Sequence, residues 1–148
     1  MIYLGSDHAG YLVKCAIAHY LKENKIAYID CGTNSLDRTD YQKFAFQVCE
    51  NVLTAKDNKG ILVCGTGVGM SIAANKVPGI IAGLVDKKEL ATYAVSHDHC
   101  NVLCLSGQYV NIADNLAIVQ TFLNTNPLYD YHYNRIQAIM EYEKNHKK

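Results

Sequence analysis

Residues 60–69 have the sequence Gly60-Ile61-Leu62-Val63-Cys64-Gly65-Thr66-Gly67-Val68-Gly69, and this stretch decides the fold. Its first half is a near-continuous apolar run, which is typical of a strand buried on both faces of a parallel sheet. Its second half places three glycines at alternate positions, ahead of helical spacing that starts at Ser71. The stretch therefore predicts a buried strand, a tight turn and a helix, the repeating unit of an α/β fold.

Strand-like and helix-like segments alternate along the rest of the chain as well. Further apolar runs predict strands over residues 2–6, 27–30, 80–85 and 102–106. Helical spacing predicts helices over residues 10–24, 41–55, 71–76, 87–96, 112–125 and 131–148. Repeated βα units of this kind form a parallel sheet covered by helices. We therefore predict one domain, residues 1–148, with a five-stranded parallel sheet and a C-terminal helix that is free to dock on a second subunit.

Composition excludes several classes of protein. Lys plus Arg and Asp plus Glu both number 14, so no net field attracts nucleic acid or an anionic membrane. The longest apolar runs, such as residues 80–85, are too short to span a bilayer, and Ile2-Tyr3-Leu4 follows Met1 without a basic leader. The six cysteines are scattered and form no CxxC pair, which is typical of reduced thiols, and we expect five of them to be small buried residues. A cytoplasmic protein is expected.

The glycine loop, residues 65–69, is the first candidate for a binding site, because α/β proteins bind ligands at the carboxyl ends of their strands. Its backbone amides can converge on an anion. An equally good alternative at this point is a tight turn whose glycines serve packing only. The G-x-G-x-G spacing lacks a glycine of the dinucleotide fingerprint, and no Gly-Lys-Ser/Thr of a P-loop follows.

Cys64 directly precedes the glycine loop. There the free amides and the helix dipole would stabilise a thiolate, which can act as a base or as a nucleophile. A buried cysteine with a purely structural role is the alternative.

Two groups of histidines offer further candidates. Asp7-His8 follows the first strand and is either a carboxylate that orients an imidazole or a polar cap for the next helix. Residues 97–104 include His97, His99, Cys100 and Cys104, which are metal-type ligands. A closed zinc site takes paired ligands from two separated elements, however, so we expect no metal here and a proton-transfer histidine instead.

Short motifs in a fixed order resemble those of a known family. They are Gly5-Ser6-Asp7-His8-Ala9-Gly10, Asp30-Cys31-Gly32-Thr33, Arg38-Thr39-Asp40-Tyr41, Cys64-Gly65-Thr66-Gly67-Val68-Gly69, Ala73-Ala74-Asn75-Lys76 and His97-(x3)-Asn101-Val102-Leu103. The set resembles the type B ribose 5-phosphate isomerases and their galactose-6-phosphate isomerase relatives, and the resemblance weakens after about Ser106. It implies a single Rossmann-like three-layer α/β/α domain. It also implies a homodimer or homotetramer with shared active sites, and aldose–ketose isomerisation of a sugar phosphate without metal or cofactor.

The resemblance implies a role for each matched residue. Cys64 would be the catalytic base that moves a proton between C2 and C1, and His97 would assist opening of the furanose ring. Asp7 and His8 would hold the ring-oxygen side and the phosphate. The amides of the glycine loop would stabilise the enediolate. The remaining substrate-binding candidates are Tyr41, Gly65, Thr66, Gly67, Val68, Gly69, Ser71, Asp98, Gln108, Tyr131 and Arg135.

The chain also departs from the family pattern. Where the family usually has His-Asn-Asp, this chain has His97-Asp98-His99. The family's phosphate grip uses several arginines, whereas this sequence contains only Arg38 and Arg135, and Gln108 and Tyr131 stand at other expected arginine positions. Arg135 can still make a bidentate phosphate contact, with His8, His132, Gln108 and Tyr131 as weaker donors, so looser phosphate binding is expected.

The resulting prediction is an isomerase that interconverts ribose 5-phosphate and ribulose 5-phosphate in the pentose phosphate pathway. Cys64 and His97 occur in one chain, which favours a self-sufficient homo-oligomer over the split galactose-6-phosphate enzyme. An isomerase of allose or galactose 6-phosphate stays open, because the length of the pocket cannot be read from sequence. A non-catalytic module that binds a sugar phosphate or a nucleotide on the same fold is the alternative from another class.

Overall fold

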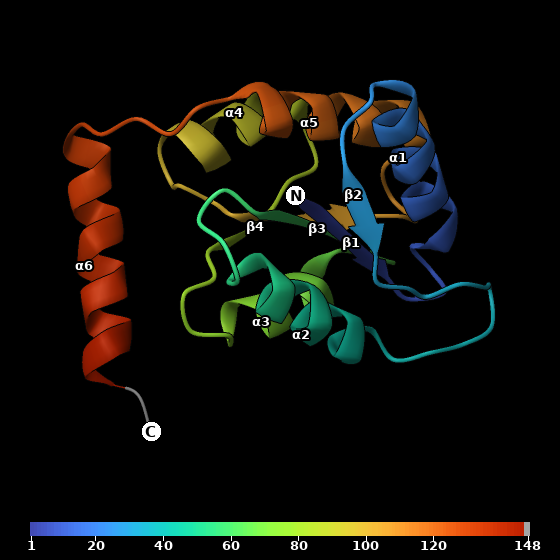
Figure 1. The fold of residues 1–148 in the computed structure, drawn as a ribbon, viewed down its shortest axis with the longest axis horizontal. Helices are drawn as coiled ribbons and strands as arrows, with labels where there is room; N and C mark the ends of the chain where they lie inside the picture. Colours follow the sequence, from blue (N-terminus) through green and yellow to red (C-terminus); the bar gives the residue numbers. More distant parts are fainter. Residues whose placement is uncertain (147–148) are drawn as a thin grey trace.

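The centre of the molecule is a parallel sheet, described by a computed structural model that covers residues 1–146 (Figure 1). The strands are β1 (Ile2–Ser6), β2 (Tyr28–Asp30), β3 (Lys59–Cys64), β4 (Ala82–Leu84) and β5 (Val102–Ser106). Their order across the sheet is β2-β1-β3-β5-β4, and every pair is parallel. The chain changes direction across the sheet between β1 and β3, which is where open α/β sheets form a crevice for a ligand.

Helices cover both faces of this sheet, as predicted. The covering helices are α1 (Tyr11–Glu23), α2 (Tyr41–Val52), α3 (Val68–Asn75), α4 (Lys88–Ser96) and α5 (Ile112–Asn124), and α6 (Tyr131–Asn145) follows them. Helices α1, α4 and α5 lie on one face, and α2 and α3 lie on the other (Figure 1). The Rossmann-like α/β/α fold with five parallel strands is therefore confirmed.

The alternation of side chains along the central strands divides the core into two clusters. On β3, Ile61 and Val63 face α1, α4 and α5, whereas Leu62 and Cys64 face α2 and α3. All of them are buried, because β3 and β5 are covered on both sides and lie away from the sheet edges. A strand buried on both faces needs apolar residues at every position, which explains the continuous runs in the sequence.

The boundaries of several elements differ from the prediction. The edge strands β2 and β4 are shorter than residues 27–30 and 80–85, because an edge strand pairs with one neighbour only. Helix α2 ends at Val52, short of the predicted residue 55. Helix α3 begins at Val68 and not at Ser71, so the last two residues of the glycine loop belong to its first turn. The predicted C-terminal helix is confirmed to Asn145, and residues 147–148 lie outside the described part.

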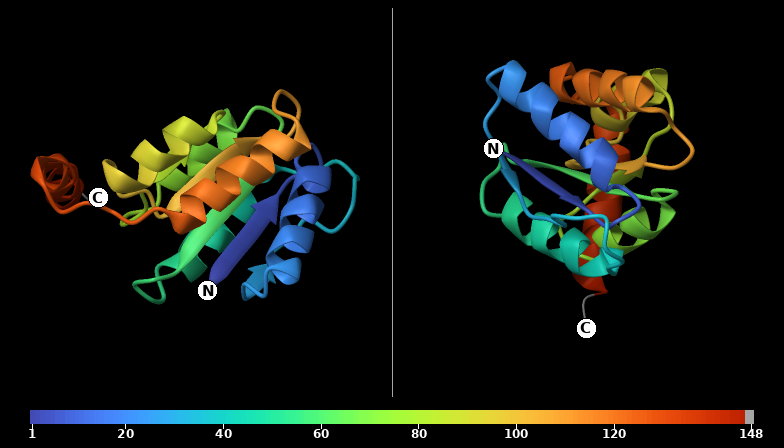
Figure 2. Two further views of the ribbon diagram at one scale, coloured as in Figure 1. Left: turned by 90° about the horizontal axis from the view of Figure 1, so that it is seen from above. Right: turned by 90° about the vertical axis from the view of Figure 1, so that its right-hand side faces the viewer.

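Helix α6 stands clear of the rest of the molecule (Figures 1 and 2). It is attached by the buried side chain of Ile136 and by the carboxylate of Glu143, which accepts a hydrogen bond from the amide of Gly79 at 3.0 Å. Farther along the helix, Ile139 is 58% exposed and Tyr142 is 67% exposed. No helix within residues 1–146 is long and apolar enough to cross a membrane.

Candidate active site

The side chain of Cys64 lies at the carboxyl end of β3, under the glycine loop. It is 4% exposed, and its Sγ accepts a hydrogen bond from the amide of Gly67 at 3.2 Å. Gly67 has φ of 81°, and a Cβ there would lie 2.4 Å from Leu84 Cδ1 and 3.0 Å from the Leu105 carbonyl oxygen. Only glycine fits this backbone without strain. The turn thus directs an N–H dipole at the sulfur.

The rest of the glycine loop forms the start of α3. The amide of Val68 donates to Thr66 Oγ1 at 3.2 Å, and the hydroxyl of Ser71 donates to the Val68 carbonyl at 2.8 Å. The predicted oxyanion hole therefore has two amides, those of Gly67 and Val68, already engaged within the loop. First-turn amides such as that of Gly69 have no helical acceptor and are better placed to receive an anion.

The loop after β1 lies beside Cys64. The buried carboxylate of Asp7 accepts a hydrogen bond from the Gly10 amide at 3.0 Å, and the Asp7 amide donates to the Val63 carbonyl at 3.3 Å. A Cβ on Gly10 would lie 2.4 Å from the Val63 carbonyl oxygen, so α1 starts in direct contact with the end of β3. Asp7 thus fixes the turn that leads into α1, although the cap residue itself is Gly10.

The segment before α2 brings two more predicted residues to this edge. The amide of Thr39 donates to Nδ1 of His8 at 3.2 Å, which leaves Nε2 of that imidazole for another partner. Tyr41, the first residue of α2, lies against the glycine loop, because a Cβ on Gly69 would be 2.6 Å from its Cζ. A side chain at Gly69 would therefore have to displace the tyrosine ring.

The turn after β5 completes the same edge. The amide of Gly107 donates to the Cys64 carbonyl at 2.8 Å, and that of Gln108 donates to the Gly65 carbonyl at 3.0 Å. The side chain of Gln108 also lies against Gly65. The structure thus brings together a carboxyl-edge site, which consists of Cys64, residues 65–69, Asp7, His8, Tyr41 and Gln108.

Sequence reasoning missed two residues that support this site. The hydroxyl of Ser106 donates to the Gly65 carbonyl at 2.7 Å and accepts from the amide of Tyr109 at 3.0 Å. Thr39 holds His8 through its backbone. The signal for Ser106 is its register opposite Cys64 at the ends of adjacent strands. Thr39 lies in the motif Arg38-Thr39-Asp40-Tyr41, but its contact with His8 is made by the backbone, so the type of its side chain does not indicate it.

The remaining predicted residues gather elsewhere. His97 caps the C-terminus of α4 and stacks on His132, with ring centroids 3.7 Å apart and an interplanar angle of 9°. The Tyr131 ring lies 4.1 Å from that of His132, and the Arg135 guanidinium lies 5.5 Å from the Tyr131 ring centre. With Tyr93, whose ring centre is 4.9 Å from that of His97, these residues form the histidine cluster. Its members are Tyr93, His97, Tyr131, His132 and Arg135.

Asp130 fixes one member of the cluster. One oxygen of its carboxylate, Oδ1, is 2.9 Å both from the His132 amide, which donates to it, and from His132 Nδ1. These contacts, above all the one from the amide, lower the pKa of Asp130 below its ordinary value. The predicted binding residue Asp98 is exposed and follows His97 in the chain. It lines a shallow cleft with the residues of β4, and it takes no part in the ring stacking.

The histidine cluster and Cys64 lie at opposite edges of the sheet. His97 precedes the start of β5, whereas Cys64 is paired in register with Ser106 at its end. Val102 and Ser106 are four residues apart, which is about 13 Å at roughly 3.3 Å per residue. In Figure 1, α6 and the loop that leads to α2 lie on opposite sides of the molecule. One chain therefore does not bring Cys64 and His97 to the same substrate.

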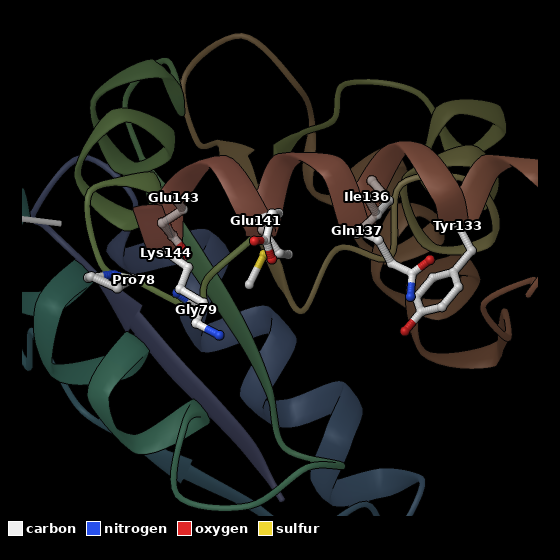
Figure 3. A pocket seen from close by; sticks show the side chains of 9 residues that line it. Pro78, Gly79, Tyr133, Ile136, Gln137, Glu141, Glu143 and Lys144 are labelled. Atoms are coloured by element: carbon white, nitrogen blue, oxygen red, sulfur yellow. The ribbon is translucent and has the colours of Figure 1, made fainter. Parts of the chain in front are cut away.

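A cleft of about 500 Å³ separates α6 from the turn at Pro78 and Gly79 (Figure 3). Tyr133, Ile136 and Glu143 line it from the helix side. None of the predicted site residues contributes to it, so its size alone does not make it the site.

The five cysteines other than Cys64 differ in burial. Burial raises the pKa of Cys49 to about 12 and that of Cys100 to about 12, and it raises that of Cys104 well above its ordinary value. The expectation of five small buried cysteines is wrong for two of them. Cys15 is exposed on the outside of α1, and Cys31 is half-buried because it follows the edge strand β2.

The candidate metal ligands do not converge. His99 Nε2 lies 2.6 Å from the Leu128 carbonyl oxygen, and the ring packs against Tyr129 and Tyr133. Cys104 is buried within β5. In residues 1–146 no three His, Cys, Asp or Glu side chains are grouped so that they could hold a metal ion.

Comparison with known proteins connects this geometry to a family. The family described as Ribose/Galactose Isomerase matches residues 2–139. The chain belongs to this family. It is 43% identical to a probable ribose-5-phosphate isomerase B of Mycoplasma genitalium. The 145 aligned residues are 97% of this chain and 95% of the relative.

Solved structures of isomerase-family members have the same fold. The ribose-5-phosphate isomerase B of Mycoplasma genitalium, solved with bound ribulose 5-phosphate, matches with a TM-score of 0.94 at 43% identity, over 97% of this chain and 95% of that chain. The ribose-5-phosphate isomerase B of Clostridium thermocellum matches with a TM-score of 0.95 at 39% identity, over 99% of both chains.

Proposed function

We propose that this chain is an aldose–ketose isomerase that interconverts ribose 5-phosphate and ribulose 5-phosphate. The observation that carries the proposal is the contact between the Gly67 amide and Cys64 Sγ, at the base of a loop suited to an anion. The ribulose 5-phosphate bound to the related Mycoplasma genitalium enzyme supports the same substrate here.

The chemistry is a proton transfer. The thiolate of Cys64 takes the proton from C2 of the open-chain aldose, and the electron pair moves into a C1–C2 double bond. Negative charge then develops on the oxygen at C1 as the enediolate forms. Amides at the start of α3 stabilise that charge. The proton of the C2 hydroxyl moves to the C1 oxygen, and the Cys64 thiol returns its proton to C1 as the C2 oxygen becomes the carbonyl of the ketose. Ordinary general-base catalysis contributes about 10²–10⁴-fold to such a step.

Ring opening needs a second group, and we assign it to His97 of the partner subunit. The two edges of one sheet are too far apart to share a substrate, so the carboxyl-edge site of one chain faces the histidine cluster of another. The exposed side of α6, with Ile139 and Tyr142, provides apolar surface for such an assembly. A homodimer or homotetramer with shared active sites follows from this arrangement.

Phosphate would be held from both chains. His8 offers its Nε2 at the carboxyl edge, and Gln108, which lies against Gly65, is a neutral donor there. Arg135 and His132 of the partner subunit would add charge from the histidine cluster, with Tyr131 as a neutral neighbour. Because only one guanidinium takes part, phosphate binding is expected to be looser than with several arginines.

The chain would work as one domain, in the cytoplasm, since the sugar phosphate it is proposed to use is a metabolite there. A six-carbon aldose phosphate is the second candidate substrate, because the cavity formed between two subunits sets the length of sugar that fits.

The test is a substrate panel with the purified protein and its Cys64→Ala variant. Wild type should convert ribose 5-phosphate faster than allose or galactose 6-phosphate, and Cys64→Ala should lose roughly 10²–10⁴-fold in kcat while melting normally. Cys49→Ala is the matched control, since Cys49 is a second buried thiol of the same core cluster but is none of the proposed site residues. Absence of turnover with any of these sugar phosphates, or full activity of Cys64→Ala, would refute the proposal.

A further inference from the structure

Lys14 is a fully buried charged residue outside both the carboxyl-edge site and the histidine cluster. It lies on α1 and is 1% exposed. Its Nζ donates to Asp30 Oδ1 at 2.5 Å and to the Thr33 carbonyl at 2.6 Å, and it lies 5.5 Å from the centre of the Tyr11 ring. A buried ammonium is tolerated only when it is paired and hydrogen-bonded, so these partners explain why it is there.

One partner of Lys14, Asp30, is the last residue of β2, and the other, Thr33, belongs to the segment that follows β2. Asp30 Oδ1 also accepts from the Gly32 amide at 2.8 Å. The Gly32 carbonyl accepts from the Ser6 amide, and the Thr33 amide donates to the Ser6 carbonyl, each at 2.8 Å. Lys14 thus lies at the point where this segment joins the end of β1, immediately before Asp7 and His8.

The same segment continues into the carboxyl-edge site. Residues 34–38 run along the outside of the molecule (Figure 1), and Thr39 then contacts His8 Nδ1. Tyr41 follows at the start of α2 and lies over Gly69. Contacts that hold the beginning of this segment therefore help to determine the positions of Thr39 and Tyr41.

We propose that Lys14 is a positioning residue for substrate binding: its ammonium holds Asp30 and the Thr33 carbonyl, and so places residues 33–41 for Thr39 to orient His8 and for Tyr41 to cover the glycine loop. Lys14 touches neither Cys64 nor His8, and it acts only through this segment. The expected change in KM rests on the proposed function, in which His8 binds the phosphate of the substrate.

An apolar side chain at position 14 would fill the space but donate no hydrogen bond. The Asp30 carboxylate, which is partly exposed, would then turn toward water, and the Thr33 carbonyl would lose its buried donor. The core around α1 would stay intact, whereas the start of the segment would be released. A misplacement of about 1 Å at a binding residue can lower activity by roughly 10²-fold.

The test compares Lys14→Met with Val13→Ala. Val13 is the neighbouring buried residue on α1 and packs in the core without contacting the segment, so it controls for lost stability. At equal folded fraction, Lys14→Met should raise KM for ribose 5-phosphate by about tenfold or more with a smaller change in kcat, and Val13→Ala should change neither. The imidazole NMR signals of His8, assigned with a His8→Gln variant, should shift in Lys14→Met and stay in place in Val13→Ala.

Two further arms keep the outcomes separate. If Lys14→Met does not fold, Asp30→Asn removes the charge of the partner at a partly exposed position, and it should shift His8 and KM in the same direction by less. The His8 signals need no turnover, so they test positioning even if wild type proves inactive. Unmoved His8 signals in both variants, or a KM that matches that of Val13→Ala, would overturn the proposal.

Discussion

The carboxyl-edge site and the histidine cluster are built in different ways. At the carboxyl edge, backbone amides and carbonyls of three loops bond to one another around Cys64, and glycines allow the loops to approach closely. At the amino edge, imidazole and phenol rings from α4 and α6 stack with few backbone contacts. The first arrangement is complete within one chain, whereas the second presents its groups outward. This difference is what an active site shared between two copies requires.

The largest expected effect tests that division directly. Cys64→Ala and His97→Ala homo-oligomers should each be nearly inactive, but mixing and reassociating them should restore about one quarter of wild-type activity in the dimer case. Half of the dimers are then mixed, and in each of these one of the two sites has both intact residues.

The control for this experiment is the Cys64→Ala,His97→Ala double variant mixed with wild type, which should give only the activity of undisturbed wild-type sites. If each active site were formed within one chain, no mixture of the two single variants would regain activity. That result would contradict an active site shared between the carboxyl-edge site of one chain and the histidine cluster of another.

The next effect addresses how the carboxyl edge is built from backbone. Gly67→Ala places a Cβ against Leu84 and Leu105 at positive φ, so the free energy of unfolding should fall by about 1–3 kcal/mol. The amide that faces Cys64 should move as well, and kcat should fall by roughly 10²-fold. Gly79→Ala is a matched control, because Gly79 also has positive φ (92°) and lies outside both groups. It should lose stability with kcat unchanged. Equal kcat losses in both variants would show that strain alone explains the effect.

The carboxyl edge was also the part that sequence could predict. Continuous apolar runs identify β3 and β5, and the rule that ligands bind after parallel strands selects Cys64, the glycine loop and Asp7-His8. The predicted start of α3 was less accurate. The helix begins at Val68, directly after Gly67, whereas helical spacing in the sequence is evident only from Ser71.

The amino edge could not be placed from sequence, for a physical reason. His97 ends α4, whereas His132 and Arg135 lie on α6, and the contact between His97 and His132 depends on how α6 leaves the body of the fold. Periodicity predicts the helix but contains no information on its direction. The resemblance named these residues, and only the structure shows that they lie away from Cys64.

The smallest expected effect concerns the contact that orders the histidine cluster. Hydrogen bonds to the carboxylate lower the pKa of Asp130 in the folded chain relative to the unfolded one. A carboxylate whose pKa is lower in the folded chain stabilises the fold at any pH above its pKa in the unfolded chain, which is about 3.9. That stabilisation is lost as the pH falls through the folded pKa. The melting temperature of wild type should therefore exceed that of Asp130→Ala most at neutral pH, and the gap should narrow below about pH 4.

Asp130→Asn separates the two contacts that the carboxylate makes. Asparagine also caps helices well, so α6 should keep its N-terminus, whereas the charge beside His132 Nδ1 is removed. If the carboxylate matters mainly as a cap, Asp130→Asn should melt like wild type at neutral pH. If it also holds the His132 ring against His97, kcat should fall severalfold in Asp130→Asn with little change in melting. A kcat equal to wild type in both Asp130 variants would show that the stacking of His132 on His97 does not depend on Asp130.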